Sequence, residues 1–390
     1  MNNDSLTPPL LPPATLGMLG GGQLGRFFVA AAHEMGYRVW VLDPDPHSPA
    51  GRIADRHLCA DYNDAAALAV IAEGCAAVTT EFENVPAATL DHLARFVPVR
   101  PSASAVGVCQ NRILEKSFLA EHGLPHGEFA VIRNEMDLAD VPDTLFPAIL
   151  KVARFGYDGK GQSTVADRGE ALAAFRQCSG EACVLEKRLT LDCEVSVVLA
   201  RDQAGTVRAF PVAENRHRAG ILDVSLVPAR VAPALAEEAV ALAGQIAEKL
   251  AYVGVMAVEF FVVDGRLRVN EMAPRPHNSG HYTLDACVAS QYEQQVRALC
   301  GLPLESGAVH SAAAMVNVLG DLWFAHDTAS AQEPDWGQLF AVPALKLHLY
   351  GKHQARRGRK MGHFTALAPL EDAEGALHAA LSARTAIGIG

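Results

Sequence analysis

Residues 269–283 read Val269-Asn-Glu-Met-Ala-Pro-Arg-Pro-His-Asn-Ser-Gly-His-Tyr-Thr283. The first of these residues continue an apolar alternating stretch and are expected to end a strand. Two prolines then turn the chain into a polar loop that carries guanidinium, imidazole, amide and hydroxyl groups. This density of chemical groups at the end of a strand predicts a functional site, around which the rest of the chain is organised.

A second carboxylate, Glu259, lies in the preceding apolar strand, residues 255–263, and Asp264-Gly265 between the two strands is a strong hairpin signal. A tight hairpin places Glu259 opposite Asn270 or Glu271. Because like charges facing each other across a strand pair repel, we expect a cation between them. Mg²⁺, held by carboxylates and phosphate oxygens, fits this arrangement. The alternative is a solvated hairpin face.

The composition excludes several classes of protein. A chain of 390 residues that is 50% hydrophobic can bury a large core, in two or three domains. A net charge of −11 argues against a nucleic-acid partner. The 8 cysteines have no CxxC spacing, which indicates neither a zinc knuckle nor a disulfide framework and suits a reducing cytoplasm. Residues 1–13 are expected to be a disordered tail, and no apolar run is long enough to predict a membrane partner.

The N-terminal region predicts a βαβ unit. Residues 14–19 form a strand, the glycine turn 20–25 leads into a helix that ends near residue 36, and the strand 37–42 ends at Asp43. The pattern also matches a dinucleotide fingerprint, so an NAD site is one hypothesis. Tight packing of strand against helix, or a phosphate ligand that is not a dinucleotide, are the alternatives.

A third βα unit follows, with a helix over residues 64–73 and a strand over 76–80 that ends in Glu81-Phe-Glu-Asn84. Because ligands gather at the carboxyl ends of parallel strands, these residues and the glycine turn are expected to share one edge of the sheet. Either carboxylate of this segment alternatively complements a helix dipole. The first domain is expected to end near residue 102, before a helical stretch over 103–122.

The second domain is predicted to begin with a helix and the strand 147–152, which contains Lys151 near its end. The loop that follows, residues 154–162, carries three glycines, whose backbone amides can fold over a polyphosphate. Lys151 can neutralise phosphate as a point charge. The Walker A spacing is missing. The loop is therefore predicted to be a mobile lid, the alternative being a plain surface loop.

Further strands are expected over residues 183–189, 192–199, 207–213 and 221–227, with residues 214–218 as a connection. A nucleotide is expected to use backbone groups at 187–189 for adenine and Glu194 for ribose. Helices are predicted over 232–251 and 285–299. The last region has strand-like pieces at 312–319 and 344–349, followed by a basic loop at 350–363. The hypotheses for this loop are nucleic-acid binding, a solvated surface, or a phosphate grip by Lys352 and Arg359.

Taken together, these motifs resemble the ATP-grasp superfamily and, within it, the 5-(carboxyamino)imidazole ribonucleotide synthase family of purine biosynthesis. The superfamily resemblance is carried by Lys151, the loop 156–162, Glu186-Lys187, Glu194 and the Glu259…Asn270-Glu271 pair. The narrower one rests on residues 20–26, 81–84, 270–281 and 351–363, and it spans about residues 14–370. The string at 274–280 is the most specific. Arg357 departs from the family, which often has proline there.

The resemblance implies an α/β and α+β fold: a Rossmann-like domain over 14–102, an ATP-grasp domain over 103–300 and a small C-terminal domain over 301–390. The implied reaction joins bicarbonate to 5-aminoimidazole ribonucleotide with ATP as cosubstrate. It needs Mg²⁺, with Mn²⁺ as the alternative metal, and neither biotin nor NAD. A cytoplasmic homodimer that binds no nucleic acid and no membrane is expected.

The resemblance also assigns residues to four groups. ATP would be held by Arg112, Lys151, Gly156, Tyr157, Asp158, Gly159, Lys160, Gly161, Gln162, Glu186, Lys187, Arg188, Leu189, Glu194, His217, Asn270 and Glu271. The metal would be held by Glu259 and Glu271. Catalysis and bicarbonate binding would fall to Tyr157, Asp158, Arg275, His277, Asn278 and Ser279. The ribonucleotide would meet Gln23, Leu24, Glu81, Asn84, Lys160, Lys352, Arg359 and Lys360.

Three alternative functions are each consistent with some of these motifs. An NAD-dependent oxidoreductase would use the glycine turn and Asp43, but leaves Glu259 and Glu271 without a task. Another ATP-grasp ligase or carboxylase, such as biotin carboxylase or glycinamide ribonucleotide ligase, is expected to lack the strings at 277–280 and 359–363. A non-catalytic nucleotide-binding module would bind ATP without turnover.

Overall fold

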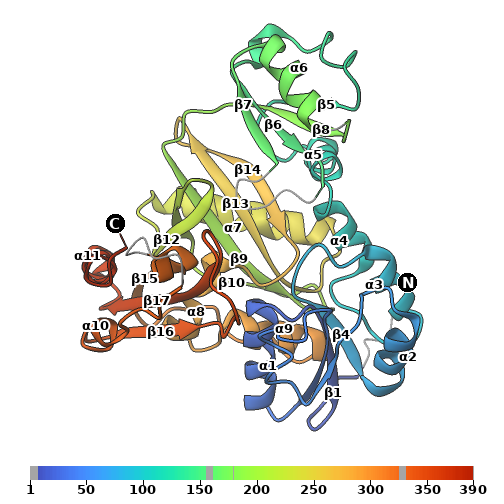
Figure 1. The fold of residues 1–390 in the computed structure, drawn as a ribbon, viewed down its shortest axis with the longest axis vertical. Coiled ribbons are helices and arrows are strands. Elements are labelled where there is room, and N and C mark those ends of the chain that lie inside the picture. The colour runs from blue at the N-terminus through green and yellow to red at the C-terminus, as the bar shows by residue number, and fades with distance from the viewer. Residues whose placement is uncertain (1–7, 155–160, 179, 325–330, 390) are drawn as a thin grey trace.

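The computed structural model describes residues 8–154, 161–178, 180–324 and 331–389. Three sheets organise this part of the chain (Figure 1). The N-terminal sheet and the C-terminal strands lie at one end of the molecule, and the smallest α/β unit lies at the other end, beyond the large central sheet.

The N-terminal sheet is parallel, with strand order β3-β2-β1-β4, and confirms the predicted βαβ start. Its strands are β1 (Thr15–Leu19), β2 (Arg38–Leu42), β3 (Arg56–Leu58) and β4 (Ala77–Thr80). The helices of this region are α1 (Gln23–Glu34), α2 (Ala65–Gly74), α3 (Ala87–Leu93), α4 (Ala103–Cys109) and α5 (Arg112–Glu121). Strand β1 is almost fully buried because it lies between two neighbours, as its uninterrupted apolar sequence requires.

The second sheet belongs to the separate unit at the top of Figure 1. Its strands are antiparallel and lie in the order β5-β8-β6-β7. Its elements are β5 (Phe129–Ile132), η1 (Asp143–Leu145), β6 (Ala148–Val152), β7 (Gln162–Val165), α6 (Arg168–Gln177) and β8 (Cys183–Lys187). Helix α6 covers one face, with Ala171, Ala174 and Phe175 buried against the strands. The unit therefore has a hydrophobic core of its own.

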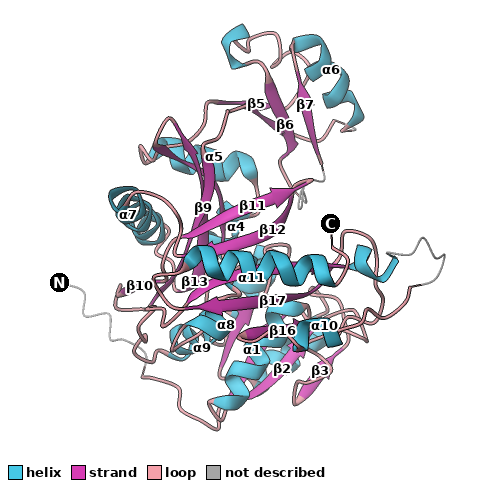
Figure 2. Ribbon diagram, turned by 90° about the vertical axis from the view of Figure 1, so that its left-hand side faces the viewer, coloured by secondary structure: helices cyan, strands magenta, loops and turns pink. Residues whose placement is uncertain are grey.

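The central sheet has 9 strands in the order β14-β13-β9-β11-β12-β15-β17-β16, with β10 paired to β9. Its first half comprises β9 (Cys193–Arg201), β10 (Val207–Ala209), β11 (Ala213–Arg218), β12 (Ile221–Val227), α7 (Pro233–Lys249), β13 (Gly254–Val263) and β14 (Arg266–Ala273). After η2 (Asn278–Gly280), α8 (Thr283–Ala286) and α9 (Gln291–Cys300), the C-terminal region adds β15 (Ala312–Leu319), η3 (Gly320–Phe324), α10 (Gly337–Phe340), β16 (Leu345–Leu349), β17 (Lys360–Ala368) and α11 (Ala373–Ala386). Helix α11 packs against the strands β15 and β17 and runs alongside β17 in Figure 2.

Several predicted elements need correction. Residues 214–218 are not a connection, because they belong to β11, which pairs with both β9 and β12. The helical stretch 103–122 is two helices, since the side chain of Asn111 caps the start of α5. The helix predicted over 285–299 begins only at Gln291, where the Ser290 hydroxyl caps α9.

The two ends of the chain also differ from expectation. Leu10, inside the predicted disordered tail, donates its backbone N–H to the Cys300 carbonyl at 2.8 Å and accepts a hydrogen bond from the Tyr37 hydroxyl at 2.7 Å. The order thus starts before residue 13, while residues 1–7 lie outside the described part. The predicted basic loop ends early, because Lys360 already opens strand β17.

A buried cluster of rings joins the three regions of the chain. Phe27 of α1 lies 5.1–5.9 Å, between ring centroids, from five rings of the central and C-terminal segments: His281, Tyr292, His348, Tyr350 and His363. His348 and His363 stack nearly face to face at 4.7 Å. Such stacking holds the domains together by aromatic contact.

Within the described residues, no helix is both long and apolar enough to cross a membrane. All eight cysteines lie in the described ranges and none forms a disulfide, as their spacing indicated.

Candidate active site

A cleft of about 720 Å³ opens where the three sheets approach one another. It is lined by segments that are far apart in the sequence: the glycine turn, the segment after β4, the start of α5, strand β6, strands β11 to β14 and the loop after β14. Most of the predicted site residues contribute to its wall, namely Gln23, Leu24, Glu81, Asn84, Arg112, Lys151, Gln162, Glu194, His217, Glu259, Asn270, Glu271, Arg275, His277, Asn278 and Lys360.

Two carboxylates face each other at the centre of the cleft. Glu259 of β13 pairs with Glu271 of β14 across the hairpin, and a β-bulge follows Glu259, so the sequence prediction of this pair is confirmed. Burial, with the neighbouring Glu271 as the second cause, raises the pKa of Glu259 to about 7. The side-chain carbonyl of Asn270 is buried and has no hydrogen-bond partner within the described part of the chain.

These oxygens fit a hard divalent cation. Two facing carboxylates and an unsatisfied amide oxygen repel one another without a positive charge between them, and Mg²⁺ prefers oxygen ligands of this kind. The donor set of Glu259, Glu271 and Asn270 therefore suits the metal that the sequence predicts.

A buried charge cluster lies under strand β6. Lys151 Nζ is 3.2 Å from one carboxylate oxygen of Glu186, and Lys116 Nζ is 3.3 Å from the other. Burial alone would raise the pKa of Glu186, but Lys151, Lys116 and Arg112 together lower it to about 2. Glu186 is therefore ionised, which fixes Lys151 at the wall of the cleft and leaves a net positive charge for an anionic ligand.

The loop after β14 is fixed to the N-terminal domain by an ion pair. Arg275 donates to both carboxylate oxygens of Glu83, the longer contact being 3.3 Å from Arg275 Nη2. Burial opposes this charge, yet Arg275 lowers the pKa of Glu83 to about 2. Two parallel N–H···O bonds give such a pair its directionality, so the guanidinium has one defined position at the cleft wall.

Glu81 has a structural partner that the sequence suggested only in outline. Its carboxylate accepts hydrogen bonds from the backbone amides of Gly22 and Gly25, the latter at 2.7 Å, at the start of α1. The Gly21 amide donates to Asp43 at 2.7 Å. The amides that a dinucleotide pyrophosphate would need are thus occupied by the protein's own carboxylates, which satisfy the helix N-terminus.

The far wall carries the pair Glu194 and His217. His217 Nδ1 lies 2.9 Å from Glu194 Oε2, and burial, which lowers the pKa of His217, is outweighed by Glu194 and Glu259, which raise it. Apolar side chains of Ile149, Leu191 and Phe261 line the same cavity. A slot with apolar walls and a carboxylate at its rim is suited to a base and its ribose.

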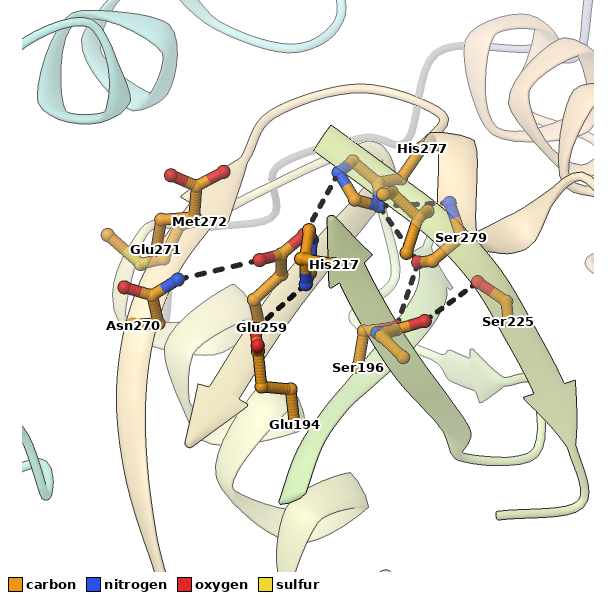
Figure 3. Close-up of polar contacts among 12 residues, drawn as sticks. Glu194, Ser196, His217, Ser225, Glu259, Asn270, Glu271, Met272, His277 and Ser279 are labelled. Carbon is orange, nitrogen blue, oxygen red and sulfur yellow. Dashed lines mark hydrogen bonds and ion pairs between the residues drawn. The ribbon is translucent and has the colours of Figure 1, made fainter. Parts of the chain in front are cut away.

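The polar loop supplies an unpaired amide. His277 Nε2 lies 3.4 Å from Glu259 Oε1, and its Nδ1 lies 2.8 Å from the Ser279 hydroxyl (Figure 3). Among the residues that the structure describes, neither the oxygen nor the nitrogen of the Asn278 amide has a hydrogen-bond partner, although the side chain is buried. Because buried polar groups are rarely left unpaired, this amide is suited to a small polar ligand that enters the cleft.

The C-terminal region reaches the cleft through two lysines. Lys360 lines it directly. Lys352 donates to Gln23 Oε1 at 2.6 Å and so contacts a residue of the wall.

Comparisons with known proteins agree with this arrangement. Family models match the chain as a ribonucleotide synthetase preATP-grasp domain over residues 13–110, an ATP-grasp domain over 117–292 and a phosphoribosylaminoimidazole carboxylase C-terminal domain over 313–374. The N5-carboxyaminoimidazole ribonucleotide synthase of Bacillus subtilis is 39% identical, with 93% of this chain and 94% of that protein covered. The chain belongs to the N5-carboxyaminoimidazole ribonucleotide synthase family.

Solved structures of N5-carboxyaminoimidazole ribonucleotide synthases have the same fold. One, an ADP complex, is 39% identical with a TM-score of 0.90 over 97% of this chain and 98% of the other. An enzyme of this name from Aspergillus clavatus, solved with ADP and 5-aminoimidazole ribonucleotide, is 30% identical with a TM-score of 0.84 over 95% of this chain and 98% of the other. The ATP-grasp fold expected from the sequence is confirmed.

Some predicted residues of this N5-carboxyaminoimidazole ribonucleotide synthase homologue lie elsewhere. Ser279 is fully buried within the loop, where its hydroxyl contacts His277, and Glu186 lies behind Lys151. Lys187 points to Glu128 at 2.8 Å, and the segment 187–189 does not line the cleft. Arg359 donates to the Gln354 carbonyl and is likewise absent from the cleft wall. Gly156, Tyr157, Asp158, Gly159 and Lys160 lie outside the described residues; Gly161 is described but does not line the cleft.

The sequence did not single out several residues of the site. Lys116 completes the Glu186 cluster, and Glu115 accepts the backbone N–H of Met272 at 2.5 Å. Both lie on α5, a segment that the sequence predicted as helical and in which only Arg112 was singled out. Gln291 of α9 holds the polar loop by accepting from the backbone N–H of His277 and donating to its carbonyl, both at 2.8 Å. A buried glutamine inside a helix is a signal that could have identified it.

Proposed function

We propose that this chain catalyses the ATP-dependent carboxylation of 5-aminoimidazole ribonucleotide by bicarbonate. The products are N5-carboxyaminoimidazole ribonucleotide, ADP and phosphate, in purine biosynthesis, which makes the chain a carbon–nitrogen ligase. The observation that carries the proposal is the single cleft, which combines a cation-binding carboxylate pair, a fixed lysine for phosphate and an arginine–asparagine loop for a small anion.

ATP is assigned to the side of the cleft between β6 and β14. Its base would lie against Ile149 and Phe261, with Glu194 near the ribose. Lys151 and Arg112 would meet the phosphates as point charge and planar fork. Glu259 and Glu271, with Asn270, would hold Mg²⁺ against the phosphate oxygens; when bound, the ion neutralises charge that builds up during phosphoryl transfer.

Bicarbonate is assigned to the polar loop. Arg275 is held in one position by Glu83, and neither hydrogen-bonding group of the Asn278 amide is used by another described residue. These groups would align the bicarbonate oxygen with the γ-phosphorus, and the positive charge of Arg275 and Lys151 would reduce the repulsion between the two anions. The product of this step is carboxyphosphate, whose carbonyl carbon is then attacked by the exocyclic amine of the ribonucleotide.

The ribonucleotide is assigned to the N-terminal rim, near Gln23, Leu24, Glu81 and Asn84, with its phosphate towards Lys352, Arg359 and Lys360. Because Lys352 already contacts Gln23, the C-terminal and N-terminal domains would meet on the same substrate. The loop 156–162, predicted to be a mobile lid, would close over the intermediate, and Asp158 would orient the amine. Residues 156–160 of this loop lie outside the described residues. The catalytic role of Asp158 fails if Asp158→Asn retains full turnover.

The organisation of the whole chain is also part of the proposal. We propose domain boundaries at residues 14–102, 103–300 and 301–390, a homodimer, and a cytoplasmic location. The unpaired cysteines support the location, since a reducing compartment keeps thiols free. Neither NAD nor biotin is required for the proposed reaction.

The test is incorporation of ¹³C-bicarbonate into 5-aminoimidazole ribonucleotide by the purified protein, followed by mass spectrometry. We expect a labelled carboxylated product that needs ATP and Mg²⁺. ATP hydrolysis without a labelled ribonucleotide would contradict the proposed reaction and indicate the activity of another ATP-grasp enzyme.

A further inference from the structure

A buried chain of hydrogen bonds runs from strand β11 to the imidazole of His277. Asn215 Nδ2 donates to Ser196 Oγ at 2.8 Å, and Ser196 Oγ donates to Ser279 Oγ at 2.8 Å. Ser279 Oγ in turn lies 2.8 Å from His277 Nδ1. These side chains are at most 7% exposed, so water does not compete for their hydrogen bonds. Figure 3 shows the row, with Ser225 beyond its far end and Glu259 beyond His277.

The directions of these hydrogen bonds determine which nitrogen of the His277 ring carries the hydrogen. Because Ser279 Oγ accepts from Ser196, its own single hydrogen is free to point at His277 Nδ1. The backbone N–H of Ser279, which can only donate, also points at this nitrogen, at 3.3 Å. Two donors therefore converge on Nδ1, which must carry a lone pair and no hydrogen.

The other ring nitrogen faces an acceptor. His277 Nε2 is 3.4 Å from Glu259 Oε1, and a carboxylate at this position requires a hydrogen on the ring. In a neutral imidazole one nitrogen donates and the other accepts, so both sides of the ring select the same tautomer.

We propose that Asn215 and Ser196 are positioning residues that hold His277 in its Nε2–H tautomer, so that the imidazole serves the reaction as a hydrogen-bond donor towards Glu259. The assignment rests on the proposed function for the role of Glu259. A donor at this place orients one carboxylate oxygen and leaves the other towards Asn270 Nδ2, which is 3.5 Å away. His277 is then excluded as a base for bicarbonate, because its only lone pair is directed away from the cleft, at Ser279.

The tautomer can be measured without any substrate or metal. Metal-free protein labelled with ¹⁵N-histidine has 15 histidines, and the signal of His277 is identified by its loss in His277→Gln. We expect an unprotonated Nδ1 and a protonated Nε2. The opposite pattern, or an equal mixture in the wild-type protein, overturns the proposal, whether or not the protein carboxylates the ribonucleotide.

A matched pair of serine variants separates positioning from packing. Ser196 and Ser225 are both buried, and each is hydrogen-bonded to the Asn215 amide. Ser196 donates directly to Ser279, the neighbour of His277, whereas Ser225 donates to Asn215 Oδ1 at the far end of the row. We expect Ser196→Ala to give a mixture of tautomers and to lower kcat about tenfold, the effect of one lost hydrogen bond, with little change in KM for the ribonucleotide.

Ser225→Ala removes a hydrogen bond of the same kind and is expected to keep the His277 tautomer and to stay within about twofold of wild-type kcat. Equal losses of kcat in both variants, with the wild-type tautomer retained in Ser196→Ala, would mean that these hydrogen-bonded side chains contribute only to core packing. That result would overturn the proposal. If no variant, nor the wild type, shows carboxylation, the NMR result alone decides the tautomer, so the two proposals fail separately.

Discussion

The charge of Lys151 is the residue-scale feature on which ATP use depends. It is the cation fixed at the cleft wall by an ionised partner, Glu186, which Lys116 also neutralises. Lys151→Met keeps the length of the side chain and its packing, while Glu186 retains one lysine. We expect kcat to fall about a hundredfold, the usual effect of removing one group that stabilises developing charge. The exposed Lys249→Met on α7 serves as the control in the same steady-state assay and should be unchanged.

Glu186 also predicts how stability depends on pH. Its pKa in the folded protein is about 2, below the ordinary glutamate value of about 4.3. A carboxylate with a lowered folded-state pKa stabilises the fold above its unfolded pKa, and this stabilisation is lost as pH falls towards the folded pKa. Glu186→Gln should therefore cost about 3–5 kcal/mol at pH 7, because it leaves buried lysines unpaired.

The difference between wild type and Glu186→Gln in the urea midpoint should shrink between about pH 5 and pH 3, because the Glu186 carboxylate of the unfolded wild-type chain is protonated over this range while the folded one stays ionised. A gap that stays constant over this range would mean that the variant acts through packing and not through charge.

At this scale the sequence predicted the residue types better than their partners. Glu259 and Glu271 were predictable because a two-residue turn fixes which positions face each other. Arg275 was predicted as an anion ligand, but its ion pair with Glu83, 192 positions away, depends on tertiary packing that no local pattern encodes. Likewise, Lys116 is nearly fully buried on a helix where a lysine is ordinarily exposed.

The polar loop after β14 is the element whose rigidity should control bicarbonate use. A methyl group added at Gly280 would lie 2.6 Å from Gln291 Oε1, the atom that accepts the backbone N–H of His277. Gly280→Ala must therefore shift Gln291 or the loop. We expect kcat/KM for bicarbonate to fall about tenfold, as expected when one orienting hydrogen bond is lost.

Gly244→Ala on α7 is the matched control, because its added methyl group meets no atom within 4 Å. Alanine in a helix interior should leave activity unchanged and raise the free energy of unfolding by about 0.5–1 kcal/mol. If Gly280→Ala retained full bicarbonate kinetics, Gln291 would not be positioning the loop.

Elements with a strong period or a clear turn were predictable, and polar strands were not. The βαβ start and the β13–β14 hairpin follow from buried apolar runs and from Asp264-Gly265. Strand β11 was missed because its sequence, Ala-Glu-Asn-Arg-His-Arg, has no alternating apolar residues. Its polar side chains serve the cleft and the hydrogen-bond chain instead, and function therefore overrides the usual pattern.

At the scale of the whole molecule, the ring cluster around Phe27 should make the domain assembly sensitive to acid. Burial lowers the pKa values of His281 and His363 well below the ordinary value, so both rings are neutral when folded. The unfolded chain binds these protons below about pH 6.5, and the folded state therefore loses about 1.4 kcal/mol per pH unit for each such ring as the pH falls further. The measurement is the urea midpoint between pH 7 and pH 5.

His363→Phe removes one of the two titrating rings. It should therefore roughly halve the loss of unfolding free energy that His281 and His363 together cause between pH 7 and pH 5. His378→Phe, the same change at an exposed position on α11, should leave the slope as in the wild type. Equal slopes in all three proteins would contradict a role for the buried rings.

The shared central sheet was the global feature that sequence reasoning could not supply. Strand β15 pairs with β12, from Val224↔Val316 to Val227↔Ala313, so the C-terminal region continues the ATP-grasp sheet. Pairings between strands so distant in the chain depend on the assembled core and not on local pattern. The resemblance of several short motifs to a known family predicted the types of domain. Only the structure shows that the C-terminal region shares a sheet with the ATP-grasp region.

The most direct test of the whole account is ADP release by the purified protein with ATP, Mg²⁺ and bicarbonate, with and without 5-aminoimidazole ribonucleotide. The cleft geometry predicts strong stimulation by the ribonucleotide that also requires bicarbonate, because both must lie beside the γ-phosphate for productive turnover. ADP release that is indifferent to the ribonucleotide, or no release at all, would contradict the account.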